Sequence, residues 1–211
     1  SNFSAMPSVV AEGRRVINNI ERSASLFLTK NIFSFALTLT ALIAALKYPI
    51  TPSQLSLFNI TLIGIPSFIL ALEPNTSMVR GRFLFNAFIR ALPAGLTDFL
   101  ALLGTILACR HYGVPSDQLG TMATIVIAVI GFMMLYRIGR PLNSLRIGLI
   151  VSMVVLFVFG ALVFTGLFTL VPLSSTALWI TVAVTAVSVP LMIILSWITG
   201  RFDPAVKKRR K

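Results

Sequence analysis

A few polar residues interrupt the long apolar stretches of this sequence, and their spacing bears on cation binding. Asn31 and Ser34 lie three residues apart, and Thr38 follows four residues later. In an α-helix, residues with this spacing share one face. A cation at the midplane of a membrane needs oxygen atoms to replace its water shell. Asn31 and Ser34 are therefore candidate cation ligands, and the alternative is that they form hydrogen bonds between packed helices.

Asn59 and Pro66 mark a second candidate segment. Pro66 has no N–H, so the carbonyl of Leu62 loses its helical partner, and Gly64 lets a backbone or an ion approach closely. Freed carbonyls at membrane depth are tolerated where they line a polar cavity, and they bind hard cations well. We predict a mixed cation site that is formed by these carbonyls, Asn59, Asn31 and Ser34. A kink that serves only helix packing is the alternative.

Asp98 is the only carboxylate that the sequence places well inside an apolar stretch. It follows Arg90 by eight residues, about 12 Å along a helix. Ionisable groups at such depth are usually functional or paired, so Asp98 is a further candidate for the ion path. A protonated or hydrogen-bonded structural aspartate is the alternative.

The remaining polar candidates are expected to be structural. Glu73 is expected to face Arg80 or Arg82, and Cys109 and His111 are expected to lie in a solvated loop without a metal. The basic run at residues 207–211 is expected to anchor the topology or to bind anionic lipid.

Six apolar stretches are long enough to cross about 30 Å of hydrocarbon as helices. They lie near residues 26–46, 55–73, 86–108, 119–136, 147–170 and 177–198. Of all residues, 56% are hydrophobic and only 11% are charged. A transmembrane barrel would instead show alternation in segments of about ten residues. We predict an all-α integral membrane protein with a six-helix transmembrane bundle.

The basic residues predict the orientation of this bundle. Of the 18 Lys and Arg residues, 15 fall on one side, whereas Lys47 and Arg110 fall on the other and Lys30 lies at the inner end of the first span. Such an excess marks the cytoplasmic side. Tyr and Trp residues lie at the span ends, as expected for the membrane–water interfaces. We predict a multi-pass protein of the plasma membrane with both termini cytoplasmic. The net charge of +12 thus reflects membrane topology, and we expect no nucleic acid partner.

The first helix is predicted to be much longer than a membrane span. Pro7 suits a helix start, and no proline follows before Pro49. A helix over residues 8–46 would measure roughly 58 Å, nearly twice the hydrocarbon thickness. We expect its first half to stand in the cytoplasm as a stalk, and the chain to be the C-terminal part of a larger protein.

Two segments resemble one family. Residues 2–20, NFSAMPSVVAEGRRVINNI, resemble the junction at which the phosphorylation domain of P-type ATPases continues into transmembrane helix five, and EGRRVINNI is quite specific to these cation pumps. Residues 59–75, NITLIGIPSFILALEPN, resemble helix six of bacterial pumps in the CtpE-like, calcium-pump-like group. The resemblance extends in order over the whole chain, as helices five to ten.

The resemblance implies ATP-driven transport through an aspartyl phosphate, with ATP and magnesium as cofactors of the intact protein. The sequence contains no Asp-Lys-Thr-Gly-Thr motif, so we expect this fragment to bind neither cofactor and to be inactive alone. Its expected partners are the transported cation, the lipid bilayer, and the missing N-terminal cytoplasmic domains and helices one to four. Residues 1–23 would then be the end of the phosphorylation domain and the stalk, 24–199 the transmembrane domain and 200–211 a basic cytoplasmic tail.

The sequence departs from calcium pumps at some ligand positions. In that branch of the family, helices four, five, six and eight supply the cation ligands. Ser34 stands where the animal calcium pumps carry a glutamate, and Leu62 and Ile63 replace their Thr–Asp pair. These departures argue against a two-ion carboxylate site of that kind.

We predict the membrane module of a cation pump, with calcium as the leading ion. One alternative is a P-type ATPase for magnesium, a polyamine or lipid. Another is a free-standing six-helix channel or membrane scaffold.

Overall fold

The computed structural model describes residues 6–75, 78 and 82–202, and every regular element in these ranges is a helix. The elements are α1 (Met6–Ile43), α2 (Pro52–Phe58), the π-helix η2 (Asn59–Gly64), α3 (Ile65–Ala71), α4 (Phe83–Tyr112), α5 (Gln118–Ile138), α6 (Ser144–Val163) and α7 (Ser175–Gly200). Together, α2, η2 and α3 make one span, so the described residues contain six helical spans long and apolar enough to cross a membrane. The predicted all-α, six-helix membrane fold is confirmed.

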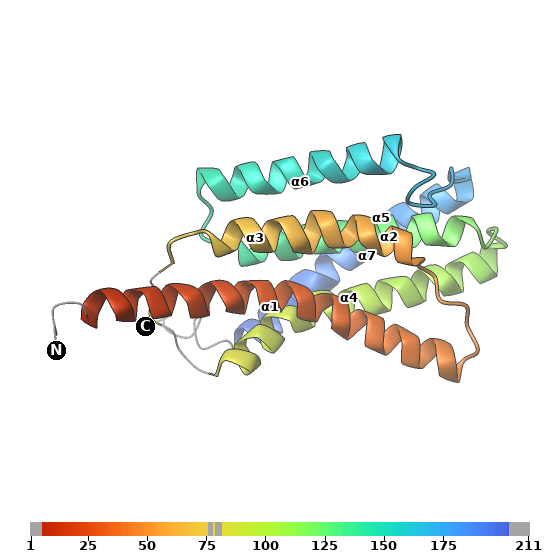
Figure 1. Ribbon diagram of the computed structural model, residues 1–211. Helices are drawn as coiled ribbons and strands as arrows, with labels where there is room; N and C mark the ends of the chain where they lie inside the picture. The colour runs from red at the N-terminus through yellow and green to blue at the C-terminus, as the bar shows by residue number, and fades with distance from the viewer. Residues whose placement is uncertain (1–5, 76–77, 79–81, 203–211) are drawn as a thin grey trace.

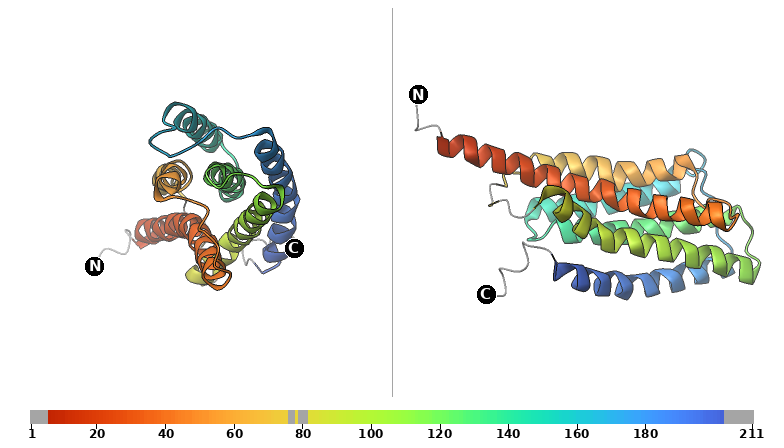
Figure 2. Two further views of the ribbon diagram at one scale, coloured as in Figure 1. Left: turned by 90° about the vertical axis from the view of Figure 1, so that its right-hand side faces the viewer. Right: turned by 90° about the horizontal axis from the view of Figure 1, so that it is seen from below.

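The six spans form a bundle with α5 at its centre. Seen along the bundle in Figure 2, α5 is surrounded by α1, α2–α3, α4, α6 and α7. Of the six spans, α5 has the largest share of buried residues. Contacts between α4 and each of α1, α5 and α7 complete the packing on one side, and α6 lies against η2 and α5 on the other. The spans α1, α6 and α7 have the smallest shares of buried residues.

The first helix is continuous, as predicted, and extends beyond its neighbours. Its 38 residues measure about 57 Å, and Figure 1 shows its first turns projecting past the ends of the other helices. It ends at Ile43, a few residues before the predicted end at residue 46. The reason is Ala45, which has a left-handed backbone (φ 49°) and interrupts the helix without any proline.

Several glycines let helices approach closely in the interior, and two of them lie where α1 and η2 meet their neighbours. A Cβ atom at Gly95 of α4 would lie 2.7 Å from Ile32 Cβ and 3.1 Å from the Thr29 carbonyl oxygen of α1. A Cβ atom at Gly131 of α5 would lie 3.0 Å from the Leu62 side chain. Small residues at helix contacts are typical of membrane bundles, in which van der Waals packing drives association. The contacts at Gly95 and Gly131 bring α1 and η2 against the buried helices α4 and α5.

One end of the bundle, at which α4 and α6 begin, carries two groups of ion pairs. We call it the basic end. Arg90 pairs with Glu21 at 2.7 Å. Glu73 binds Arg146 at 2.6 Å and Arg22 at 3.0 Å. The sequence predicts that Glu73 faces Arg80 or Arg82. In the structure its partners instead come from α1 and α6, and Arg80 lies outside the described residues.

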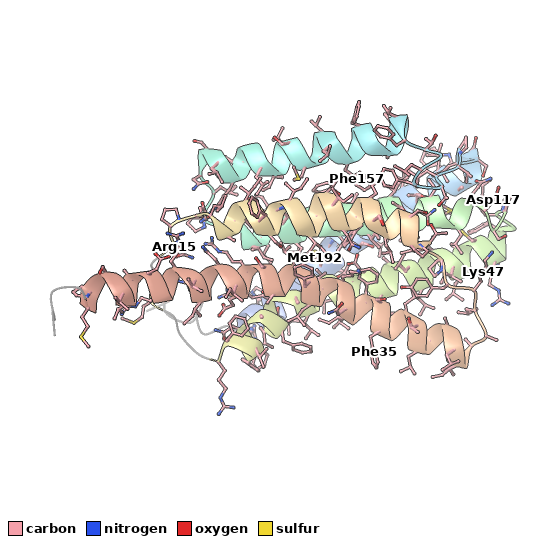
Figure 3. The ribbon with its side chains drawn as sticks, viewed as in Figure 1. Arg15, Phe35, Lys47, Asp117, Phe157 and Met192 are labelled. Carbon is pink, nitrogen blue, oxygen red and sulfur yellow. The ribbon has the colours of Figure 1, made fainter. Side chains whose placement is uncertain are left out.

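The opposite end holds Lys47 and Asp117, whereas Arg15 lies on the projecting part of α1 (Figure 3). Here the predicted fifth span is too long, because α6 ends at Val163 instead of residue 170. The following segment turns back, with Thr169 in a left-handed conformation (φ 50°). The Gln54 amide donates to the Thr169 carbonyl at 3.0 Å. This polar contact fixes a loop that is too apolar to be recognised from composition.

Candidate functional site

The centre of the second span is wound as a π-helix. At the end of η2, the Ile65 N–H donates to the Ile60 carbonyl, five residues back. Pro66 follows immediately and has no N–H to offer either Leu62, four residues before it, or Thr61, five residues before it. Single π-turns inside α-helices are frequent at functional sites. The predicted irregularity at Pro66 is therefore present, but it is a π-helical segment on the N-terminal side of the proline.

Asn59 begins this segment, and its side-chain oxygen Oδ1 is buried. The oxygen has no hydrogen-bond partner among the described residues. The hydroxyl of Ser67, in the first turn of α3, is also buried without a partner there. An amide or hydroxyl oxygen buried without a partner costs about 1–3 kcal/mol. Such a cost in a packed membrane span is a reason to look for a ligand.

α1 runs antiparallel to this span in a regular register. The Asn19 amide donates to the Ala71 carbonyl at 2.7 Å, and the Ser23 hydroxyl to the Ser67 carbonyl at 3.5 Å. Further along, the rings of Phe33 and Phe58 meet edge to face, with centroids 6.2 Å apart. The same face of α1 thus follows α3, η2 and the end of α2.

The polar residues predicted on one face of α1 lie apart from these contacts. Asn31 and Thr38 are exposed, on the side from which Phe35 projects away from the bundle (Figure 3). The Ser34 hydroxyl is half-buried and lies 3.1 Å from the Tyr48 hydroxyl. The structure therefore does not bring Asn31 and Asn59 into contact within the described residues.

Asp98 is fully buried in α4, with 0% of its surface exposed. Neither carboxyl oxygen has a hydrogen-bond partner among the described residues. Gly95 of the same helix lies against Ile32 of α1. Asp98 comes three residues after Gly95, which places it about 4.5 Å further along the bundle, near the level of Phe33. The Phe33–Phe58 contact places Asn59 at a similar level from the other side of α1. Asn59 and Asp98 thus occupy one layer of the bundle without an observed contact.

A site for a soft transition metal finds no support in the described part of the chain. No group of three or more His, Cys, Asp or Glu side chains is close enough to hold a metal there. Both residues that were expected in a solvated loop lie in the last turn of α4. Cys109 is buried there, with its sulfur 3.5 Å from the Met122 sulfur, whereas His111 is exposed. The available donors are amide, carbonyl and hydroxyl oxygens and one carboxyl group, which suit hard cations.

Sequence reasoning missed two features of this region. The register of α1 against η2, which depends on Asn19, Ser23 and Phe33, had no signature beyond their helical spacing. The cluster around Glu73 joins residues more than 50 positions apart. The sequence indicates this cluster only through Asn143, a helix-capping residue that is followed three positions later by the basic Arg146.

Comparison with known proteins identifies similar chains, although no family model matches. The chain is 30% identical to the calcium-transporting ATPase CtpE of Mycolicibacterium smegmatis, over 95% of this chain and 27% of that protein. It is 36% identical to the protein of that name from Mycobacterium bovis, over 72% of this chain and 21% of that protein. It is 31% identical to a probable cation-transporting ATPase of Streptococcus pneumoniae, over 72% and 20% of the two chains. The chain thus spans about a fifth to a quarter of these relatives.

Proposed function

We propose that this chain, which belongs to the cation-transporting P-type ATPases, forms part of the ion-translocation path of such a pump. The relatives are transporters of cations by name, and several are named for calcium. The described residues supply six membrane spans. Calcium is the leading ion because it prefers oxygen ligands in flexible arrangements, and oxygens are what the interior of this bundle offers.

The observation that carries this proposal is the interrupted second span. Because residue 66 is a proline, it offers no N–H to the Thr61 or Leu62 carbonyl. The buried side-chain oxygen of Asn59, in the same π-helix, has no partner among the described residues. Unwound carbonyls and polar side chains at the middle of a membrane span are typical of cation sites in transporters. We assign Asn59, Leu62 and Pro66 to the centre of the site.

Asn31, Ser34 and Asp98 complete the proposed path with different roles. Asn31 faces outward from the described helices, so it would take part only where another segment of the full-length protein covers this face. Ser34 would have to exchange Tyr48 for the ion. Asp98 lies deeper, in α4, and supplies the only carboxyl oxygens of this layer among the described residues.

The remaining parts of the pump are also proposals. The relatives are several times longer than this chain, and we infer that the uncovered part includes the phosphorylation and nucleotide-binding domains and helices one to four. ATP and magnesium would bind in those domains. The projecting part of α1, within residues 1–23, would be the stalk to them, with 24–199 crossing the plasma membrane. Both termini would be cytoplasmic, although residues 1–5 and the basic tail from 203 lie outside the described ranges.

ATP-driven uptake by the full-length protein in inside-out vesicles tests this function. We expect uptake of radioactive calcium that requires ATP and is abolished by a calcium ionophore. Magnesium or a polyamine that stimulates ATP hydrolysis without calcium would favour the alternative substrates. Cation movement independent of ATP would favour a channel.

A further inference from the structure

The side chain of Gln54 is buried in the first turn of α2, at the opposite end of the bundle from the basic end. Only 2% of its surface is exposed. Its Oε1 atom accepts a hydrogen bond from the Thr51 N–H at 2.9 Å, which completes a capping box. Its Nε2 atom donates to the Thr169 carbonyl at 3.0 Å. This second bond goes beyond capping, because it joins α2 to the segment between α6 and α7.

Helix α5 holds the Gln54 amide from another side. A Cβ atom at Gly120 would lie 2.6 Å from Gln54 Nε2 and 2.7 Å from Oε1. The amide therefore occupies the space that any larger residue at position 120 would need. With its oxygen and its nitrogen both hydrogen-bonded and Gly120 against it, the amide is fixed in one orientation.

The face of the second span that carries Gln54 continues to the π-helix. Gln54, Phe58 and Leu62 follow one another at intervals of four residues, and residues with this spacing share one face of a helix. A Cβ atom at Gly131 of α5 would lie 3.1 Å from the Phe58 ring and 3.0 Å from the Leu62 side chain. The contact of this face with α5 thus sets the position of the Leu62 carbonyl and of Asn59, which follows Phe58.

Gln54 supplies the directional part of this contact. The packing of Phe58 and Leu62 on Gly131 is apolar, and apolar contacts have no preferred direction. A hydrogen bond weakens steeply when its angle departs from linearity, so the bond from Gln54 to Thr169 selects one rotation of α2 about its axis. Gln54 lies five residues before Asn59, about 7.5 Å along the helix. It therefore acts on the site through α2 and not by binding the ion.

Hydrogen bonds attach the two halves of the second span to different parts of the bundle. The α2 half is bonded to the segment after α6 through Gln54. The α3 half is bonded to α1, through the Asn19 amide and the Ser23 hydroxyl. The π-helix η2 lies between these two attachments, so loosening either one displaces its oxygens relative to the other half.

We propose that Gln54 is a positioning residue of the cation site, which fixes the rotation of α2 and thereby orients the Asn59 and Leu62 oxygens toward the ion. This inference rests on the proposed function. Ligands have to be held to within about 0.5 Å by packing and by hydrogen bonds beyond the ligands themselves. Without the bonds of Gln54, α2 turns on α5, and the ion is bound less tightly although every ligand is still present.

The calcium dependence of ATP hydrolysis by the full-length protein tests this role. Gln54→Met removes both hydrogen bonds and keeps the length of the side chain. We expect the calcium concentration for half-maximal activity to rise about tenfold, as is typical when residues that orient metal ligands are replaced, while the rate at saturating calcium stays within about twofold of the wild type.

Gly120→Ala is a second variant, which displaces the amide from the α5 side and leaves Gln54 in place; it should show the same separation of affinity from rate. Gln118→Met is the matched control. Gln118 is another glutamine at this end, and it accepts a hydrogen bond from the Ser174 N–H at 2.8 Å. It belongs to α5 and not to the second span, so its replacement should leave the calcium dependence unchanged.

A double variant shows whether Gln54 acts through the ligands. Because Asn59→Ala removes an oxygen that Gln54 orients, adding Gln54→Met should weaken calcium binding by less than it does in the wild type. Fully multiplicative effects would contradict this link. A lower melting temperature with unchanged half-maximal calcium in both Gln54→Met and Gly120→Ala would overturn the positioning role and leave Gln54 a purely structural residue. A wild type that no cation stimulates would contradict the proposed function, and this inference with it.

Discussion

The carboxylate of Glu73 joins three parts of the chain at the basic end. It accepts hydrogen bonds from Arg146 at 2.6 Å, Arg22 at 3.0 Å and Asn143 at 2.9 Å. Burial by itself raises the pKa of Glu73, but the hydrogen bonds from Arg146 and Asn143 and the charges of Arg146 and Arg22 outweigh it and hold the pKa below its ordinary value. Glu73 is therefore ionised at neutral pH and compensates two nearly buried guanidinium groups.

Glu73→Gln should destabilise the protein, because it leaves two nearly buried arginines without their carboxylate. We expect a loss on the order of 3 kcal/mol in the free energy of unfolding. Since folding lowers the pKa of Glu73, its contribution is complete above the ordinary pKa of glutamate and is lost as the pH falls through the lower value of the folded state. The variant should lack this part of the acid dependence in thermal unfolding curves recorded in detergent.

Glu12→Gln is the matched control for that experiment. Glu12 pairs with Arg15 at 3.3 Å on the projecting part of α1, where 58% of its side chain is exposed. Exposed ion pairs contribute about 0–1 kcal/mol, so the melting temperature should barely change. Equal effects of the Glu12 and Glu73 substitutions would show that the cluster at the basic end has no special role in stability.

Individual ligands were the least predictable part of the site. The spacing of Asn31, Ser34 and Thr38 identifies one face of a helix, but it cannot say which neighbour covers that face, and the structure leaves Asn31 exposed. Asn59 and Asp98 were recognisable because polar groups are rare within apolar spans; Asp98 is fully buried, and Asn59 is half-buried with its side-chain oxygen buried. Whether any of these residues binds an ion stays a prediction.

The elements of the bundle depend on close packing at a few small residues. Gly95 is the clearest case, because α1 passes directly over it at Ile32 and Thr29. The Thr29 carbonyl is backbone and cannot rotate away from an added methyl group. Helix α1 carries the proposed stalk, so this contact connects the projecting part of the molecule to the buried helix α4.

Gly95→Ala should separate α1 from α4. The new Cβ would lie 2.7 Å from Ile32 Cβ, and overpacking of this kind costs about 1–3 kcal/mol. Gly104→Ala in the same helix is the control, since a Cβ atom added there would meet nothing within 4 Å and alanine favours helices over glycine. Thermal unfolding should show a lower melting temperature for the first variant and an equal or higher one for the second. The reverse order would contradict the packing of α1 on α4.

The elements themselves were largely predictable, and the exceptions have physical causes. Long apolar runs and charged boundaries identify six spans because lipid requires them. Composition could not locate the end of α6, because the residues after Val163 remain apolar and are held in a loop by Gln54. Composition also could not predict the π-helix. Pro66 indicates that the helix is interrupted, but the wider π-helical turns lie before the proline, in η2.

At the scale of the whole molecule, the charges of the described residues gather as the sequence predicts. Arg22, Arg90 and Arg146 lie at the basic end, and Lys47 lies at the opposite end (Figure 3). An excess of basic residues is retained in the cytoplasm. We therefore propose that the basic end is cytoplasmic, which would also place the projecting part of α1 on that side.

Cysteine labelling in whole cells tests this orientation. Ser116 and Ser174 are exposed at the opposite end and Ser144 at the basic end, and the native Cys109 is buried. With Cys109 replaced by alanine, single cysteines at Ser116 and Ser174 should react with a membrane-impermeant maleimide. A cysteine at Ser144 should react only after permeabilisation. Labelling of Ser144 alone in intact cells would reverse the proposed topology.

The calcium dependence of ATP hydrolysis by the full-length protein tests whether η2 and Asn59 form part of a cation site. Asn59→Ala removes one oxygen ligand, and Pro66→Ala restores an N–H that can pair with the freed carbonyls. Each should raise the calcium concentration for half-maximal activity about tenfold, the effect of losing roughly 1.4 kcal/mol of binding. Ser56→Ala, an exposed position of the same span whose hydroxyl binds only the Pro52 carbonyl among the described residues, should leave it unchanged. If well-folded Asn59→Ala and Pro66→Ala proteins both retain the calcium dependence of the wild type, the ion does not bind at η2 and the proposed site is wrong.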